Sequence, residues 1–350
     1  MEAIWYAIVA VMLTAWAVLD GFDFGAGVVH FVVGDDEEGR RTVLAAIGPI
    51  WDGNEVWLVA AGGVFVFAFP HAYAAALSGM YLALFVVLWL LALRGIAIEF
   101  RAVLAAPLWR QAWDGVFAFT STVMAFVAGV TFGNVVRGVP LDDTGWFHLD
   151  LFAFGGGRTG ALDAYTALVG LLSVVVLAAH GATYLAWKTG GAPGDRARGV
   201  ARRAWWVAWV LAAGVTVATA AVRPSMFTTF AARPWVWPLP AVAVAGAVVI
   251  GRALADPAAA DDAGLQRRAF LGSCAFIAGL VLATAAVLYP VLLPSTLGPR
   301  FDLDVHAAAS GNATLALGLV WWIPALGLAV AYLANAFRAM RGKVEAAEHD

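Results

Sequence analysis

The chain has 350 residues, of which 62% are hydrophobic and 13% are charged, and its formal net charge is −3. A soluble domain carries about a quarter charged residues, so this composition excludes a soluble protein. Apolar stretches long enough to cross a bilayer recur from end to end, and they predict an all-α polytopic membrane protein.

Nine of these stretches are predicted to be transmembrane helices, and the seventh is the shortest. In chain order they cover Ala3–Val33, Ala46–Pro70, Ala72–Leu93, Asp114–Val136, Asp163–Trp187, Ala204–Val222, Val236–Gly251, Ala269–Pro290 and Gly311–Phe337. This number favours two four-helix bundles plus one peripheral helix.

The whole chain, residues 1–350, is expected to form a single integral membrane domain. Helices one to five occupy residues 1–187 and are followed by a basic segment with several glycines, 188–203, which is predicted to be a cytoplasmic loop. Helices six to nine fill residues 204–338, and a polar tail covers 339–350.

The basic residues predict how the chain is oriented in the membrane. Of the 21 Lys and Arg residues, most lie in segments that would share a side with the C-terminus. The exceptions are Arg137, Arg158, Arg223, Arg233 and Arg300. The positive-inside rule therefore places the N-terminus outside and the C-terminus in the cytoplasm, and this orientation requires an odd number of spans.

Two acidic pairs interrupt the first two apolar stretches: Asp20 with Asp23, and Asp52 with Glu55. A carboxylate in hydrocarbon is costly, so it normally faces a protein interior or a water-filled path, where proton handling is a frequent use. Each pair is spaced i,i+3, which places both members on one helix face. In the predicted orientation all four lie in the cytoplasmic half of the membrane, near Arg94 as a counter-ion at the end of helix three.

A packing role is the alternative to proton handling. The carboxylates could hydrogen-bond to Arg94, Asn54 or backbone groups and so hold the helices together. The two interpretations are balanced for Asp20 and Glu55, whereas a functional role is favoured for Asp23 and Asp52.

Residues that could hold a redox centre are few. His180 is the one histidine expected inside the membrane, and a single buried histidine is more often a hydrogen-bonded packing residue than a haem ligand. Cys274 is the only cysteine, which excludes a cysteine-based metal site. From its residues alone, the chain offers no clear redox centre.

The acidic motifs occur in longer segments that are similar to a known family. Leu19–Gly27 reads LDGFDFGAG, and Ile47–Trp57 reads IGPIWDGNEVW, with Trp51, Asn54 and Trp57 around the acids. Further matches follow in order at Ala61–Gly63, Phe69–Pro70, Arg94–Gly95, Glu99–Arg101, Phe132–Asn134, Gly181–Leu185 and Tyr289–Thr296. Together they resemble subunit II of cytochrome bd quinol oxidase.

The resemblance implies a function that the composition alone does not indicate. Subunit II pairs with a similarly folded subunit I in the cytoplasmic membrane of bacteria or archaea. Subunit I carries haems b and d and the loop that oxidises quinol from the membrane pool, and the complex reduces oxygen to water with cytoplasmic protons. Subunit II is implied to be a scaffold that contributes a proton uptake path, and the matching residue is Asp52. The resemblance leaves open a quinone bound to this chain and small accessory membrane subunits.

Two other functions compete with this one. A proton-coupled secondary transporter also needs acids within the membrane, but it predicts broken helices in corresponding halves of the chain, whereas the acids here lie in helices one and two. A purely structural membrane subunit would need none of these acids for turnover.

Overall fold

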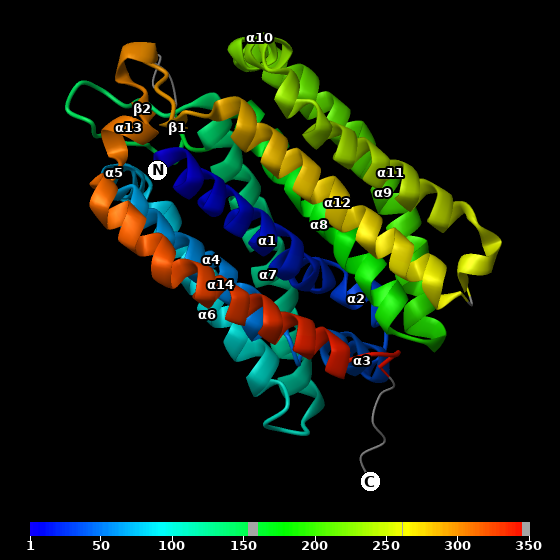
Figure 1. Ribbon diagram of the computed structural model, residues 1–350. Coiled ribbons are helices and arrows are strands. Elements are labelled where there is room, and N and C mark those ends of the chain that lie inside the picture. The colour runs from blue at the N-terminus through cyan, green and yellow to red at the C-terminus, as the bar shows by residue number, and fades with distance from the viewer. Residues whose placement is uncertain (153–159, 261, 345–350) are drawn as a thin grey trace.

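Long apolar stretches of the chain fold into helices that lie side by side (Figure 1). The computed structural model describes residues 1–152, 160–260 and 262–344, so the second half of the predicted tail and the glycine run 155–157 lie outside the described residues. Within the described residues, eight helices are long and apolar enough to cross a membrane. They are α1 (Glu2–Val28), α6 (Tyr81–Phe100), α7 (Pro107–Arg137), α8 (Ala164–Lys188), α9 (Gly191–Val222), α11 (Pro238–Ala255), α12 (Ala263–Leu288) and α14 (Asn312–Ala339).

The second predicted span corresponds to α4 (Trp51–Ala68), which packs along α1. Its first turns hold the polar residues Asp52, Asn54 and Glu55, which lower the hydropathy of an otherwise apolar 18-residue helix. Each of the nine predicted spans is therefore matched by one long helix, and the all-α membrane architecture is confirmed.

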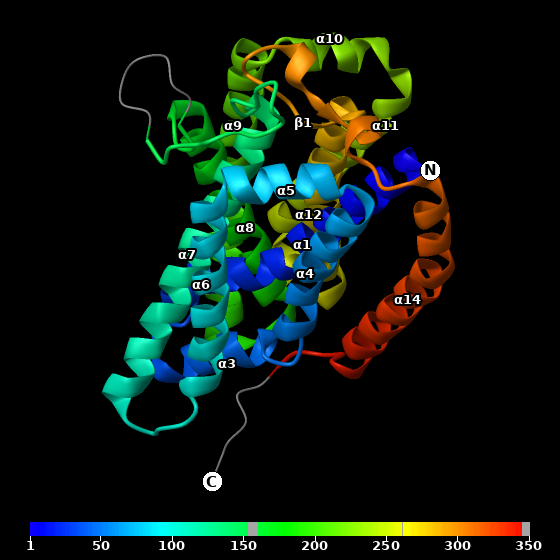
Figure 2. The same cartoon turned by 90° about the vertical axis from the view of Figure 1, so that its left-hand side faces the viewer.

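Helix boundaries in the first third differ from those predicted, because short helices interrupt the long ones. The chain continues from α1 through α2 (His30–Val33) and α3 (Glu37–Ile47), and α5 (Pro70–Gly79) precedes α6. Figure 2 shows α5 lying across the bundle. Two expected positions change as a result: Asp52 lies in the first turn of α4 rather than inside a span that begins at Ala46, and Arg94 lies inside α6 rather than at its end.

The predicted cytoplasmic loop 188–203 is mostly helical, which corrects the sequence-based boundary. Two residues, Thr189 and Gly190, separate α8 from α9. Gly191 opens α9 with φ at 57°, a left-handed conformation that glycine adopts without strain. Pro193 lies in the first helical turn, where its missing N–H would have no helical partner.

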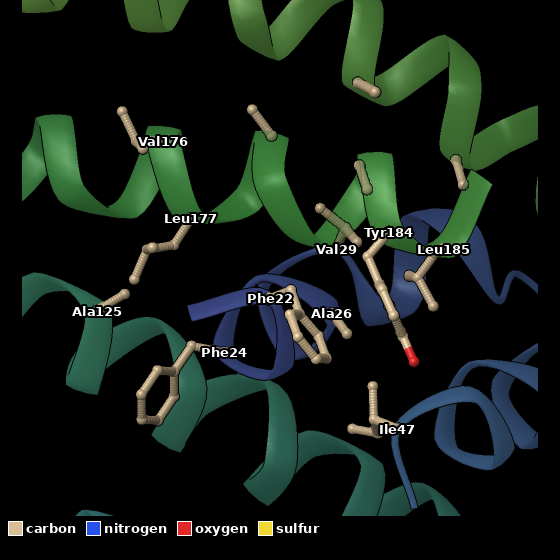
Figure 3. Close-up of a cluster of buried hydrophobic side chains, with 14 of the residues drawn as sticks. Phe22, Phe24, Ala26, Val29, Ile47, Ala125, Val176, Leu177, Tyr184 and Leu185 are labelled. Carbon is tan, nitrogen blue, oxygen red and sulfur yellow. The ribbon is translucent and has the colours of Figure 1, made fainter. Parts of the chain in front are cut away.

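The spanning helices form two groups of four around a shared centre. One group contains α1, α4, α6 and α7, and the other contains α8, α9, α11 and α12, with α1 and α7 both packed on α8. Gly25 and Gly181 make the α1–α8 contact nearly backbone to backbone, because a Cβ added at Gly181 would lie 2.3 Å from the Gly25 carbonyl carbon. Beside them, the rings of Phe22 and Tyr184 stack with centroids 4.1 Å apart (Figure 3).

Irregular elements cover the end of the bundle where α1 begins. These are α10 (Ser225–Ala232), η1 (Pro234–Val236), the antiparallel strands β1 (Val291–Leu293) and β2 (Leu303–Asp304), η3 (Pro299–Phe301) and α13 (Val305–Ala308). The opposite end carries α3 and η2 (Pro257–Ala260). We refer to this opposite end as the α3 end.

The last helix, α14, lies at the periphery and is attached mainly near its two ends. Near its start, Trp5 of α1 donates its indole N–H to the Leu315 carbonyl at 3.0 Å. Near its end, the buried Lys188 ammonium donates to the carbonyls of Met340 and Gly342. A cation at a helix C-terminus also interacts favourably with the helix dipole.

Candidate functional site

One buried ionic cluster joins the first three spans in the half of the bundle nearer the α3 end. The Arg94 guanidinium of α6 donates from one nitrogen to Asp20 of α1 at 2.7 Å and to Glu55 of α4 at 2.9 Å. Asp20 is fully buried and also accepts from the Trp16 indole at 2.9 Å. The face of the guanidinium lies 4.1 Å from the Phe24 ring centroid, so a cation–π contact supports the ion pairs.

Asp23 extends this cluster along α1. One of its carboxylate oxygens accepts from the Asn54 amide at 2.8 Å, and both side chains are fully buried. Four buried atoms in this region have no hydrogen-bond partner among the described residues: the second oxygen of Asp23, the Asn54 amide oxygen, and Nε and Nη1 of Arg94. Such atoms are normally satisfied by internal water. Two acceptors and two donors in one cluster are thus able to hold water beside the carboxylates.

The structure brings three of the four predicted acids together and leaves the fourth outside. Asp20, Asp23 and Glu55 converge near Arg94, whereas the Asp52 side chain is exposed and makes no ion pair with any described residue. Two carboxyl groups bind one guanidinium and a third, Asp23, lies beside them, so this buried cluster contains protonatable sites in excess of its cation.

Asp52 heads an exposed stripe on α4. The same face of the helix continues with Val56, Val59, Gly63 and Val66, which follow Asp52 at helical spacing. The three valines are 55%, 69% and 41% exposed. The carboxylate lies in the first turn of the helix, where the positive end of the helix dipole stabilises a negative charge. Asp52 therefore combines a place next to the buried cluster with access from outside this chain.

The other motif residues support this geometry to different degrees. A Cβ added at Gly95 of α6 would lie 3.1 Å from the Trp51 ring, so Trp51 fills the space that this glycine leaves. Trp57 packs in the hydrophobic cluster nearer the other end of the bundle. Glu99 is exposed at the end of α6 and makes no ion pair with a described residue.

A second ionic cluster, which the sequence did not single out, lies at the α3 end. Asp114 of α7 is fully buried and accepts from His30 Nε2 at 2.7 Å, Arg101 Nε at 2.6 Å and Arg40 Nε at 3.1 Å. Glu37, which is partly exposed, joins it by accepting from Arg101 at 3.0 Å. One buried carboxylate thus ties together α2, α3, α7 and the residue that follows α6.

A sequence signal for this second cluster existed. Trp113-Asp114-Gly115 repeats the Trp51-Asp52-Gly53 pattern, and His30 follows Asp23 by seven residues, which places it on the same face of α1 and its continuation. Asp114 is the first residue of the fourth predicted span, a position that by itself gives no indication of burial.

The hydrogen bonds of the two buried histidines decide whether a ring nitrogen is free to bind a haem iron. His180 uses both ring nitrogens: Nδ1 lies 2.6 Å from the Ser273 hydroxyl and Nε2 lies 2.9 Å from the Val18 carbonyl. His30 binds Asp114 through Nε2. Within the described residues, groups of His, Cys, Asp or Glu that could hold a metal ion were not found. His180 therefore has no ring nitrogen free for a haem iron, whereas Nδ1 of His30 is buried without a hydrogen-bond partner among the described residues.

Comparison with known proteins gives a consistent match over the whole chain. A family model described as cytochrome bd terminal oxidase subunit II matches residues 1–340. A probable cytochrome oxidase subunit 2 from Haemophilus influenzae is 34% identical, over 99% of this chain and 96% of that protein. Cytochrome bd-I ubiquinol oxidase subunit 2 of Escherichia coli is 31% identical, over 92% of this chain and 89% of that protein.

Two further comparisons extend this result. Cytochrome bd ubiquinol oxidase subunit 2 of Bacillus subtilis is 32% identical, over 90% of this chain and 88% of that protein. Among solved structures, the bd oxidase from Geobacillus thermodenitrificans is similar with a TM-score of 0.74 at 20% identity, covering 97% of this chain and 98% of that one. This structural likeness shows the shared fold.

Proposed function

Because the chain belongs to the cytochrome bd terminal oxidase subunit II family and is a subunit of a quinol oxidase, we propose that it delivers protons to its partner subunit through Asp52. The partner of a subunit 2 in such a complex is subunit 1. In this proposal the chain is also the scaffold on which subunit 1 assembles.

The exposed position of Asp52 carries the proposal. A carboxylate at the head of an apolar stripe is poorly placed against lipid, but it is well placed against a protein partner that offers water or polar groups. Gly63 in the same stripe lacks a side chain and would let a partner helix approach closely. We therefore assign the Asp52–Val66 stripe of α4 to the contact with subunit 1.

The buried cluster supports the same route. Glu55 lies one turn from Asp52, is 21% exposed at its side chain, and binds Arg94. Asp52 can take a proton from water at the α3 end and release it towards subunit 1.

The orientation follows from the same reasoning. We propose that the α3 end faces the cytoplasm and that the N-terminus lies outside. The basic residues favour this orientation, and Asp52, in the first turn of α4, would then lie close to cytoplasmic water.

Haems b and d and the quinol-oxidising site are proposed to belong to subunit 1. Both ring nitrogens of His180 are hydrogen-bonded, which supports this proposal. When bound in the complex, the haems supply electrons to oxygen; this chain supplies charged and protonatable side chains. A quinone bound to this chain and small accessory subunits remain hypotheses.

The test is Asp52→Asn, which keeps the shape of the side chain and removes the titratable proton. The proposal expects a large loss of oxygen consumption per haem in an assembled complex. Glu38→Gln is the matched control, because Glu38 is an exposed carboxylate on α3 at the same end, and it should leave turnover unchanged.

A purely structural role predicts the opposite pattern. The hydrogen bonds of Asp20, Asp23 and Glu55 to Arg94 and Asn54 suit helix packing as well as proton handling. On that view, Asp52→Asn lowers the yield of complex while each assembled complex keeps wild-type turnover. Wild-type turnover per haem in Asp52→Asn would refute the proton-delivery role. The family assignment gives the transporter alternative no support.

A further inference from the structure

Buried polar groups without partners recur along the contact between α1 and α7, away from Asp52. Ser121 of α7 is fully buried, and its hydroxyl has no hydrogen-bond partner among the described residues. The same holds for Nδ1 of His30, at the α3 end, and for the second carboxylate oxygen of Asp23, nearer the middle of α1. We refer to His30, Ser121 and Asp23 as the α1–α7 seam.

The helix register places these three groups in one row. Asp23, Gly27 and His30 follow each other at i, i+4 and i+7, so they share a face of α1 and its continuation. A Cβ added at Gly27 would lie 2.1 Å from the Ser121 hydroxyl oxygen, so this hydroxyl occupies the space beside Gly27. Asp114 binds His30 from the same helix, α7, that carries Ser121. The Ser121 hydroxyl is therefore level with Gly27, between His30 and Asp23.

The spacing of these residues along the helix axis is on the scale of a single water bridge. At about 1.5 Å of rise per residue, the distance along the helix axis is about 4.5 Å from Gly27 to His30 and about 6 Å from Gly27 to Asp23. One water with two hydrogen bonds of about 2.8 Å bridges about 5.6 Å. A buried hydroxyl, carboxylate oxygen and ring nitrogen without protein partners are the groups that hold such water.

We propose that the α1–α7 seam is a second proton route, which leads from the Asp114 cluster past His30 and the Ser121 hydroxyl to Asp23. His30 keeps its Nε2–H on the Asp114 carboxylate, accepts a proton from water at the unpartnered Nδ1 and releases it to the next water, so it ends neutral. The Ser121 hydroxyl accepts a proton from water on one side and gives its own to water on the other, and Asp23 receives the proton. The inference rests on the proposed role in proton delivery but names an entrance other than Asp52.

A dry, structural seam makes a different prediction for one substitution. Removing an unpartnered buried hydroxyl, as Ser121→Ala does, eliminates a desolvated polar atom, so the change is neutral or stabilising. Ser121→Ala would then assemble normally and work normally. The water route predicts normal assembly with slow proton uptake.

The experiment uses the complete complex in membranes, with Thr120→Val as the matched control. Thr120 is also buried on α7, but its hydroxyl donates to the Val116 carbonyl of its own helix at 2.8 Å. Oxygen consumption per haem is measured first. Infrared spectroscopy then follows the Asp23 carboxyl band after transfer to heavy water, and the band is assigned by its absence in Asp23→Asn.

The expected result is that Ser121→Ala slows hydrogen–deuterium exchange of the Asp23 carboxyl and lowers turnover per haem roughly tenfold, while Thr120→Val behaves as wild type. This loss is below the range for removing a positioned acid or base, because the Asp52 route would persist. Equal slowing in both variants would indicate a general disturbance of α7 and overturn the inference.

Asp52→Asn, measured alongside, separates the two proposals. In one outcome Asp52→Asn is inactive, while Ser121→Ala keeps full turnover and an unchanged rate of hydrogen–deuterium exchange at the Asp23 carboxyl. That result would overturn the proposed route along the α1–α7 seam and leave the role of Asp52 standing. Active Asp52→Asn with impaired Ser121→Ala would overturn the Asp52 role and support the seam.

Discussion

Arg94→Gln is expected to destabilise the complex through one uncompensated charge. Asp20 is fully buried and keeps only the Trp16 hydrogen bond when the guanidinium is removed. Removing one partner of a buried ion pair costs about 3–5 kcal/mol, which is about a hundredfold or more in the folded-to-unfolded ratio. Glu55 adds less to this cost, because its side chain is 21% exposed and can be solvated.

The charge argument also predicts a rescue. Arg94→Gln combined with Asp20→Asn removes both the cation and the fully buried carboxylate that it binds, so most of the lost stability should return. Arg110→Gln is the matched control: its pair with Glu37 spans 3.2 Å between side chains that are 33% and 43% exposed. Exposed pairs contribute about 0–1 kcal/mol.

The measurements are the haem absorbance of assembled complex per amount of membrane protein and the half-life of the purified complex during heating. We expect Arg94→Gln to lower both strongly, the double variant to recover them in large part, and Arg110→Gln to match wild type. Normal assembly of Arg94→Gln, or a double variant as poor as the single one, would refute the reasoning.

Three further predictions address the haems, the helix contact and the topology. His180→Ala should leave every haem band of the assembled complex in place, and loss of one specific band would contradict this. Gly181→Ala should reduce the yield of complex, because its Cβ would overlap the backbone of α1 and overpacking typically costs about 1–3 kcal/mol. Gly214→Ala is the control and should leave the yield unchanged, because a Cβ at that position meets nothing within 4 Å. Equal yields of the two variants would refute the argument. A reporter fused after Lys343 should be cytoplasmic and one inserted at Asp142 external, and opposite results would reverse the proposed orientation.

The long helices could be predicted from sequence, because hydropathy is a property of consecutive residues. Their ends could not, because charged residues do not end a helix by themselves. Arg94 looked like a terminus but is neutralised by Asp20 and Glu55 inside α6. The residues from Gly191 to Arg203 looked like a polar loop, yet they continue α9 beyond its apolar part.

The site was predictable where spacing along one helix was informative. The i,i+3 pairs drew attention to both acidic motifs, but residues three apart differ by about 60° around the helix axis. The edge of the bundle falls between Asp52 and Glu55, so one side chain faces out and the other meets Arg94. The Asp114 cluster joins residues as far as 84 positions apart, and spacing along one helix contains no information about such contacts.

The attachment of the last helix has a consequence for how the protein is made. Lys188 is separated by 152 and 154 residues from the two carbonyls that it caps. At a synthesis rate of about 5–20 residues per second, the ribosome needs about 8–30 s to make the intervening chain. During that interval the ammonium must be solvated by water or lipid head groups at the membrane surface. Closure of the C-terminal segment over Lys188 is therefore a late step of biogenesis, and a chain that stops before Met340 would never complete it.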